Sequence, residues 1–112
     1  MVEYREEELD AIYGAVAHSV RRGLLDLVKP APTRVTDLAA PFAISLAAVS
    51  KHIRVLEEAG LVRRSIHGRE HLLALEPLPL MTASVWLGSY RRFWEDRLDL
   101  LEARMREHKP DE

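Results

Sequence analysis

The side chains with the most specific chemistry lie in one short stretch of the sequence. In SLAAVSKHIRVLEEAGLV, residues 45–62, helical spacing puts Val49, Ile53 and Leu56 on one apolar face. The opposite face is short and nearly uncharged through its first two turns, and then it becomes basic. Its members are Leu46, Ala47, Ser50, Lys51 and Arg54. A solvated helix more often carries long side chains of both signs, so this face indicates contact with a large, polar, negatively charged surface.

The chemistry of this face fits the major groove of double-stranded DNA. Short side chains near the start of a helix allow its backbone to approach base edges closely. Ser50 and Lys51 supply hydrogen-bond donors, and Arg54 lies farther along, where it would meet the phosphates of the groove wall. Leu46 or Ala47 can contact a thymine methyl group. The alternative is a helical domain that simply has small residues on its surface.

A second group of candidate DNA contacts follows this helix. After Gly60, which suits a left-handed helix end, residues 61–75 change to extended periodicity around the turn sequence HGR. Two short strands around such a turn predict a β-hairpin, or wing, that lies along the DNA backbone or reaches the minor groove. We expect contacts from Arg64, His67 and Arg69, and the alternative is an ordinary solvated turn.

Five helices and one hairpin are expected to position these groups. Helical patterns with caps and breakers cover residues 6–17, 20–29, 36–40, 46–59 and 80–107. Ser19 and Ser45 are expected as amino-terminal caps, and Ser45 also belongs to the predicted DNA-contact set. The order of elements predicts a mainly α fold with a small β-hairpin, the winged helix-turn-helix. A single domain would span 1–112, with the helix-turn-helix over 36–59 and the wing over 61–75.

The first and last helices are expected to join two chains. The last helix carries a long apolar stripe, flanked by Trp86 and Phe93, that so small a domain cannot bury alone. We therefore expect a homodimer through residues 6–17 and 80–107, with two recognition helices about one turn of DNA apart. The predicted interface residues are Leu9, Ile12, Tyr13, Leu87, Tyr90, Trp94, Leu98 and Leu101. The alternative is that the last helix folds back on its own chain.

Composition bounds the class of protein. The chain has 112 residues, of which 47% are hydrophobic and 30% charged, as in a globular domain. The net charge is −2, but residues 18–71 carry nine Lys or Arg against five Asp or Glu, and both ends are acidic. A basic middle segment can attract a polyanion despite the negative total. No stretch is apolar enough to span a bilayer and no signal peptide is recognisable, so we expect a cytoplasmic protein without a membrane partner.

Enzyme, metal and cofactor chemistry have little support in the residues. Cysteine is absent, which excludes disulfides and thiolate metal ligands. Asp96 and Asp99 have no histidine at ligand spacing. There is no paired nucleophile and base and no glycine-rich phosphate loop. We therefore expect no enzyme activity, no cofactor and no metal site.

Three polar residues are expected to serve the fold. His52 lies beside the apolar face of its helix and is interpreted as a hydrogen-bonding residue at the edge of the core. Arg21 and Arg22 open the second helix, where positive charge opposes the helix dipole, so each requires a partner. That partner is an internal carboxylate or a DNA phosphate, and the internal one is favoured.

The stretches VSKHIRVLEEAGLVRR and HGREHLLALEPLPL resemble the ArsR family of bacterial winged helix-turn-helix repressors. The segment LDAIYGAVAHSVRRGLLDLV is similar to the family's opening pattern LDAxFxALADPTRRAILxLL, and WLGSYRRFWEDRLDLLEARM is similar to a subgroup with a Trp-rich dimer helix. The resemblance covers nearly the whole chain. It implies a cytoplasmic dimeric repressor that blocks promoter DNA, often that of its own operon.

Two departures from the family pattern bear on function. Family metal sensors use cysteine in the third helix, or Asp and His on the last one, and neither pattern is present, so metal sensing is not carried over. Leu46 stands where many relatives have a polar residue such as Gln, and leucine cannot hydrogen-bond a base edge. A small-molecule effector is left open. The aromatic residues of the last helix can line a pocket at the dimer interface, although packing in the core is the favoured interpretation.

The sequence thus predicts a sequence-specific DNA-binding transcriptional regulator, a dimeric autorepressor that binds an inverted repeat in promoter DNA. The alternative is a winged-helix protein-interaction module that does not touch DNA. An acidic recognition face would favour the interaction module, whereas Lys51 and Arg54 favour DNA.

Overall fold

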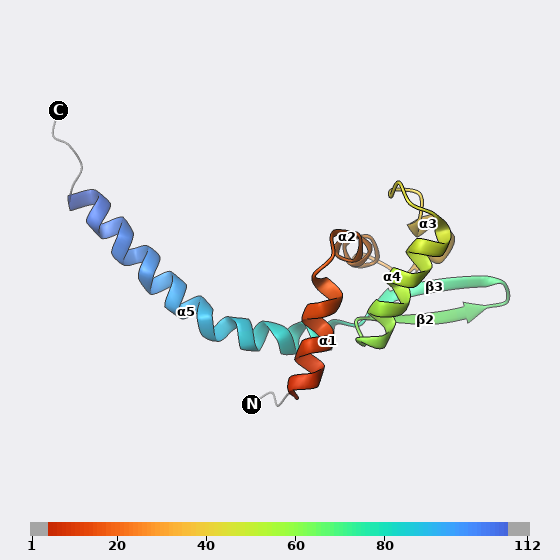
Figure 1. The fold of residues 1–112 in the computed structure, drawn as a ribbon, viewed down its shortest axis with the longest axis horizontal. Helices are drawn as coiled ribbons and strands as arrows, with labels where there is room; N and C mark the ends of the chain where they lie inside the picture. The colour runs from red at the N-terminus through yellow and green to blue at the C-terminus, as the bar shows by residue number, and fades with distance from the viewer. Residues whose placement is uncertain (1–4, 108–112) are drawn as a thin grey trace.

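The expected order of helices and hairpin is present, with one added strand (Figure 1). The computed structural model describes residues 5–107. The helices are α1 (Glu6–Val16), α2 (Ser19–Val28), α3 (Val35–Leu38), α4 (Leu46–Glu58) and α5 (Pro77–Glu107), and the strands are β1 (Thr33–Arg34), β2 (Val62–His67) and β3 (Glu70–Leu75). The predicted fold class, mainly α with a small β-hairpin after the fourth helix, is confirmed.

The sheet has three antiparallel strands in the order β1-β3-β2. The hairpin pairs Val62 with Leu75 at its base and His67 with Glu70 at its tip. Strand β1 is only two residues long and pairs with Leu72 and Leu73 of β3. It was not predicted, because two residues carry no periodicity that the sequence could reveal. Its pairing fixes the start of α3 against the hairpin.

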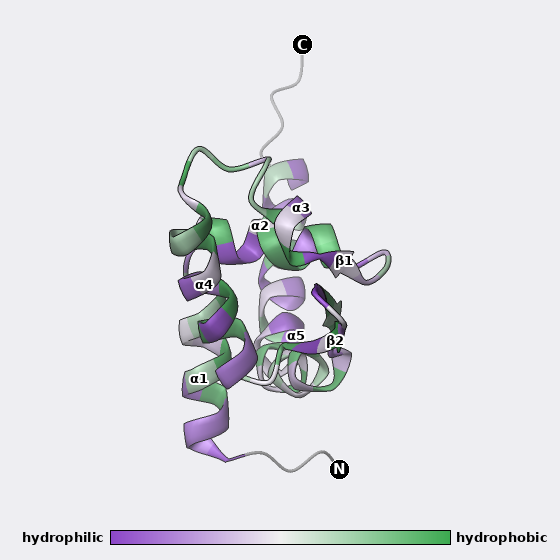
Figure 2. Cartoon of the chain, turned by 90° about the vertical axis from the view of Figure 1, so that its right-hand side faces the viewer, coloured by the Kyte–Doolittle hydropathy of each residue, from purple (hydrophilic) through white to green (hydrophobic). Residues whose placement is uncertain are grey.

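A single hydrophobic core joins α1, α2, α3 and α4 to the hairpin. Its fully buried members come from several elements and include Leu24, Leu38, Val49, Ile53, Leu56, Leu61 and Leu73. Viewed from the hairpin end, α1 and α4 lie on one side of this core and the sheet on the other (Figure 2). The buried face of α4 is the predicted one, so the orientation of this helix follows from its apolar spacing.

The connection between α3 and α4 is held by Phe42, which packs against the core. The Phe42 ring lies so close to Gly23 of α2 that a Cβ atom at Gly23 would be 2.9 Å from ring atom Cε1. Gly23 is therefore required by a close approach rather than by backbone conformation.

Three helix ends refine the sequence prediction. Helix α2 begins at Ser19, but its cap is His18, whose ring Nδ1 accepts a hydrogen bond from the backbone N–H of Val20. Helix α4 ends as predicted, with Gly60 at φ 74°. Helix α5 begins at Pro77, earlier than expected, because the first-turn N–H groups of a helix have no partner inside it and proline loses nothing there.

Helix α5 extends away from the rest of the molecule (Figure 1). Ala83 is its only buried residue among those described, and most of its large apolar side chains are exposed. Among the described residues, no helix is long and apolar enough to cross a membrane.

Candidate nucleic-acid interface

Helix α4 has one face in the core and one face in solvent. Ser45 caps the helix, and its Oγ accepts a hydrogen bond of 3.1 Å from the backbone N–H of Ala48. On the outer face Leu46, Ala47, Lys51 and Arg54 are exposed. The sixth predicted residue of this helix region, Ser50, is half-buried. The predicted face is thus assembled on one side of α4, where a groove of DNA can reach it.

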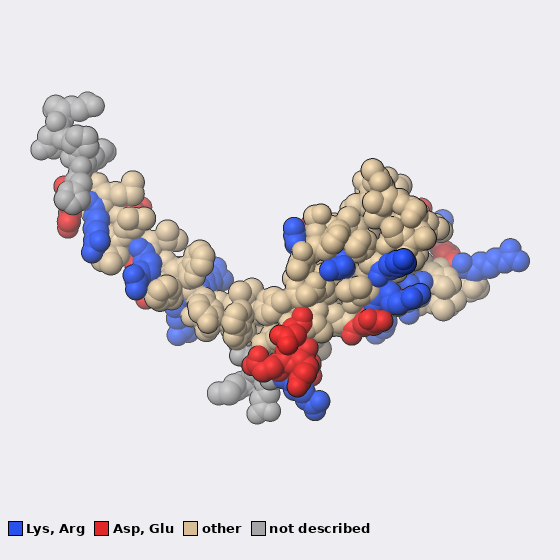
Figure 3. Space-filling view, in the orientation of Figure 1, with Lys and Arg blue, Asp and Glu red and all other residues tan. Residues whose placement is uncertain are grey.

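Positive charge gathers over α4 and the hairpin (Figure 3). Within residues 5–107, Lys51, Arg54 and Arg69 make no hydrogen bond or ion pair with other side chains or with the backbone. Their charges are therefore available to an outside anion without the loss of an internal partner. The acidic side chains of α1 form a separate cluster on another part of this view (Figure 3).

The inner side of α4 is tied to α1 and α2 through Arg21. Its guanidinium donates to the backbone carbonyls of Ala15 (2.6 Å) and Gly14 (3.1 Å), at the end of α1. It also lies 3.1 Å from Nδ1 of His52. Arg22 donates to the carbonyl of Val16 at 2.8 Å. Both arginines thus have internal partners as favoured, but these are helix-end carbonyls rather than a carboxylate, which suits the negative end of the α1 dipole.

His52 is neutral in this arrangement. Arginine has no hydrogen-bond acceptor, so Nδ1 of His52 accepts from Arg21 and carries no proton. The ring also packs on that of His18, with centroids 4.4 Å apart. Burial, followed by the charges of His18 and Arg21, lowers the pKa of His52 below its usual 6.5. The interpretation of His52 as a hydrogen-bonding residue at the core edge is confirmed.

Arg64 connects the hairpin to α4. Its guanidinium donates to both carboxylate oxygens of Glu57, at 2.8 and 3.3 Å, and lies 3.0 Å from Nδ1 of His71. This bidentate pair joins the wing directly to α4. Arg64 was predicted as a DNA contact, but in the free chain its charge already has a partner.

The turn of the hairpin carries the other two predicted wing residues. Gly68 has φ 65°, the left-handed conformation that the tight turn requires. His67 and Arg69 on either side are exposed, and so is Ile66. The tip therefore presents Arg69, which has no partner in the described part of the chain, and one apolar side chain, Ile66.

The residues predicted for the dimer interface divide into two groups. Leu9 and Ile12 are buried in the core of their own chain, which leaves their side chains little surface for a second chain. Tyr13 donates a hydrogen bond of 2.7 Å to the carbonyl of Ala83 on α5 and packs beside Trp86. The other predicted residues lie on α5 and are all exposed: Leu87, Tyr90, Trp94, Leu98 and Leu101.

Sequence reasoning missed four residues around the wing. Glu57 and His71 hold Arg64, and Arg34 of β1 forms an ion pair with Glu70. Arg34 gave no signal because the strand that carries it was not predicted. Glu57 lies seven residues before Arg64, a spacing that brings no two side chains together within one helix or one strand.

The fold and the basic outer face of α4 define the class of protein: a winged helix-turn-helix protein. A match to the helix-turn-helix domain family covers residues 16–65. An HTH-type transcriptional regulator of Mycobacterium tuberculosis, Rv2034, is 32% identical over 85 residues, which is 76% of this chain and 77% of that protein. The chain belongs to the ArsR family of helix-turn-helix transcriptional regulators, and it is a DNA-binding transcriptional regulator.

Solved structures agree with this assignment. An ArsR family transcriptional regulator has a TM-score of 0.75 and 35% identity, with 85% of this chain and 97% of that one covered. A protein described as a possible transcriptional regulator for arsenical resistance has a TM-score of 0.67 and 38% identity, with 81% and 92% covered. The fold is shared with a winged helix-turn-helix domain from Mycobacterium bovis that is described as homodimeric, at 19% identity, a TM-score of 0.62 and 83% and 94% covered.

Proposed function

We propose that two copies of this chain form a homodimer that represses transcription by binding an inverted repeat in promoter DNA. The observation that carries the proposal is the division of α4 into a buried face and an exposed face whose Lys51 and Arg54 have no partner within residues 5–107. Free cations on a helix that the core already holds in place can bind DNA phosphates without reorganisation of the protein.

The first half of α4 is the proposed reading element. Ser50 and Lys51 donate hydrogen bonds to base edges or nearby phosphates, and Arg54 binds phosphate at the groove wall. Leu46 and Ala47 contact bases through carbon atoms only, so they favour thymine methyl groups over polar base edges. The exposure of Leu46, Ala47, Lys51 and Arg54 supports their roles, and Ser50 is half-buried beside them.

The wing and the helix cap supply further contacts in the proposal. Arg69, free and at the wing tip, binds a phosphate or enters the minor groove, with His67 beside it. Ser45 uses its Oγ to accept from Ala48, which leaves its hydroxyl hydrogen for a phosphate. Arg64 contributes by setting the wing angle through Glu57, and its own contact to DNA is secondary.

Helix α5 is the proposed joint between the two chains. Its apolar side chains are exposed along its length, with Trp94 65% and Leu98 60% accessible. A hollow lined by Trp86, Leu87, Tyr90, Arg91 and Trp94 lies on this face. A second α5 is its proposed occupant, rather than a small-molecule effector, because the exposed apolar side chains continue well beyond the hollow. The homodimeric description of the Mycobacterium bovis fold relative agrees with this arrangement.

A two-fold pair explains repression in physical terms. Two α4 helices related by the dimer axis would meet major grooves about one turn of DNA apart, so the preferred sequence is an inverted repeat. A dimer on such a site within a promoter excludes the transcription machinery. The division of labour follows the expected boundaries, with 36–59 as the helix-turn-helix, 61–75 as the wing and 80–107 as the dimer helix. Access to the genome fits a cytoplasmic location.

Binding to the promoter of its own gene tests the proposal. The purified chain is titrated onto this duplex in a gel-shift assay, and the titration is repeated at rising salt concentration. Wild type should bind with an affinity that falls steeply with salt, because each phosphate contact releases counterions. Arg54→Glu should lose most of this binding.

The matched control is Arg106→Glu, which makes the same charge change in the last turn of α5, far from α4 (Figure 1). This variant should bind the duplex like wild type. Equal binding by wild type and Arg54→Glu would contradict the proposal that α4 enters the groove.

A further inference from the structure

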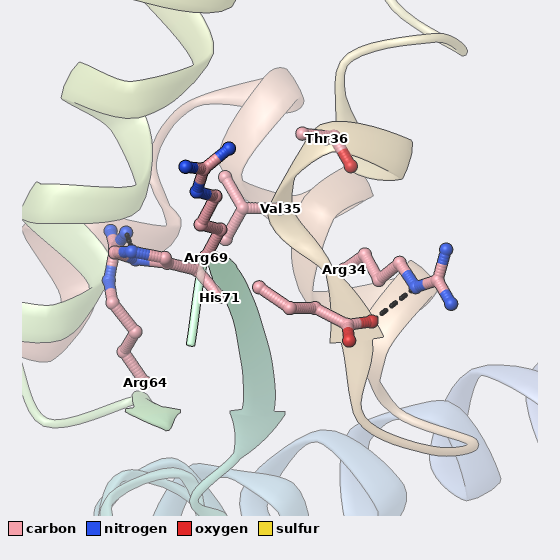
Figure 4. A pocket seen from close by; sticks show the side chains of 7 residues that line it. Arg34, Val35, Thr36, Arg64, Arg69 and His71 are labelled. Carbon is pink, nitrogen blue, oxygen red and sulfur yellow. Dashed lines mark hydrogen bonds and ion pairs between the residues drawn. The ribbon is translucent and has the colours of Figure 1, made fainter. Parts of the chain in front are cut away.

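An open groove lies where the wing meets the start of α3 (Figure 4). Its volume is about 490 Å³. The residues that line it are Arg34, Val35, Thr36, Arg64, Arg69, Glu70 and His71. The groove lies beyond the end of β1: this strand ends opposite Leu72, so within residues 5–107 no strand pairs with β3 on this side at Glu70 and His71.

The groove is strongly basic. Three guanidinium groups line it against a single carboxylate, that of Glu70. Arg69 has no partner within residues 5–107, whereas Arg64 is held by Glu57. Arg34 forms an ion pair with Glu70, and Figure 4 shows Arg34 on the opposite side of β3 from Arg64 and His71. The two side chains of the pair remain 62% and 42% exposed, so water and ions reach both.

His71 adds a ring nitrogen donor to the groove. Its Nδ1 lies 3.0 Å from Nη1 of Arg64, which can only donate, so Nδ1 accepts and Nε2 carries the hydrogen. The hydroxyl of Thr36 is a neutral polar group in the lining. Cationic and neutral donors around an open hollow match the chemistry of a phosphate oxygen.

We propose that this groove holds one backbone phosphate of the bound duplex, with Arg34 as its principal ligand and Glu70 as the internal competitor for Arg34. This proposal rests on the proposed function, since the phosphate belongs to the same DNA that α4 reads. The groove overlaps the predicted DNA-contact surface, because Arg64 and Arg69 belong to both, and this overlap supports the proposal.

In this proposal Glu70 competes with the DNA phosphate for Arg34. A carboxylate and a phosphodiester each carry one negative charge and accept the same bidentate hydrogen bonds from arginine. Binding of DNA therefore exchanges one partner of Arg34 for another and leaves Glu70 unpaired near a second anion. Glu70 thus weakens DNA binding in a way that its removal should relieve.

The test compares three single variants of the full chain on its own promoter duplex, over about 50 to 200 mM salt. Arg34→Gln should bind about eightfold more weakly near 0.1 M salt and lower the slope of log affinity against log salt by about 0.9, the value for one phosphate contact. Glu70→Gln should bind more tightly than wild type. Arg63→Gln is the control: it removes an arginine that is 75% exposed, paired with Glu76 and outside the groove, and it should leave the slope unchanged.

The opposite signs expected for Arg34→Gln and Glu70→Gln are the decisive feature. Both variants break the same ion pair, so a merely structural role for that pair would weaken binding in both, and this result would overturn the proposal. The proposal would also be overturned if Arg34→Gln bound DNA with the same affinity and the same salt slope as wild type. If Arg54→Glu still loses binding in that case, the proposed function stands and only the groove site fails. If Arg54→Glu binds normally too, the proposed function itself fails.

Discussion

Helices α4 and α5 both expose a large surface, but the two surfaces differ in what supports them. In α4 the residues Val49, Ile53 and Leu56 are fully buried, so the core fixes the helix while its polar face stays outside. In α5 only Ala83 is buried among the described residues, and the exposed side chains are largely apolar. Within one chain the core holds α4 in place, whereas the apolar face of α5 remains exposed.

This difference separates two kinds of binding surface. The α4 face is polar, carries free cations and is held rigidly by Arg21 and by the Arg64–Glu57 pair, so it can meet a polyanion as it stands. The apolar stripe of α5 exposes aliphatic and aromatic side chains and few charges, so its favourable partner is another apolar surface. The first surface depends on the core and the second on association.

The largest expected effect comes from a substitution in the apolar face of α5. Leu98→Glu puts a charge on the apolar stripe, and in a two-fold pair the interface would contain this charge twice. The proposed dimer should lose about 3 kcal/mol or more, which raises its dissociation constant over 100-fold. Because Leu98 is 60% exposed in one chain, the monomer should stay folded. Analytical ultracentrifugation measures the association and circular dichroism the fold.

Ala103→Glu is the control for this change, because position 103 lies on the opposite side of α5 from Leu98 and Leu101 by helical spacing. It should remain dimeric. A Leu98→Glu protein that is as dimeric as wild type would rule out α5 as the joint.

The next largest effect comes from a substitution that disturbs the packing around α4 and does not involve α5. Gly23→Ala places a Cβ 2.9 Å from the Phe42 ring, so the ring or the backbone that carries it must shift. The free energy of unfolding should fall by about 1–3 kcal/mol. Urea denaturation measures it, and Gly14→Ala, where a Cβ meets nothing within 4 Å, is the matched control in α1. Equal losses in the two variants would show that the Phe42 contact is not the cause.

A smaller effect concerns the link between α4 and the wing. Glu57→Gln keeps the shape but removes the charge that Arg64 faces, and both side chains are under a third exposed, at 30% and 26%. The free energy of unfolding should fall by about 1–2 kcal/mol. Glu58→Gln, an exposed neighbour on the same helix, should change it by much less. The measurement is again urea denaturation, and a larger loss for Glu58→Gln would contradict the role given to Glu57.

The sequence was sufficient for most of the fold because its strongest patterns are local. The spacing of Val49, Ile53 and Leu56, the Gly60 stop and the turn at Gly68 each determine a structure within a few residues. Strand β1 was missed because its two residues pair with partners about 40 positions away, at Leu72 and Leu73, and nothing local marks them.

The candidate site was predictable to the same extent. The outer face of α4 follows from its periodicity, whereas the Arg64–Glu57 pair depends on how the hairpin folds back against the helix. Leu9 and Ile12 illustrate a different limit. An apolar stripe looks the same in the sequence whether its own chain or a second chain covers it, so their burial within one chain could not be read from spacing.

The smallest expected effect is a dependence of stability on pH through His52. Its pKa is lowered in the folded chain, while the unfolded chain takes up a proton near pH 6.5. Between these two pH values the unfolded state binds more protons, so the free energy of unfolding falls as the pH drops below 6.5 and levels off below the folded-state pKa.

His52→Gln should flatten this dependence, because Gln can still accept from Arg21 but does not titrate. Denaturation at a series of pH values from neutral to acidic measures it. The matched control, His67→Gln at the exposed wing tip, should keep the wild-type profile. An unchanged profile for His52→Gln would remove His52 as its source.

The spacing of the two halves of the bound DNA site tests the central claim most directly. Fragments that the purified protein selects define the inverted repeat, and affinity is then measured after five base pairs are inserted between its halves. Five base pairs turn one half about half a helical turn away from the other, so a dimer with two fixed α4 helices should lose nearly all specific affinity. Unchanged affinity for this spaced site would contradict a two-fold pair that reads both halves at once.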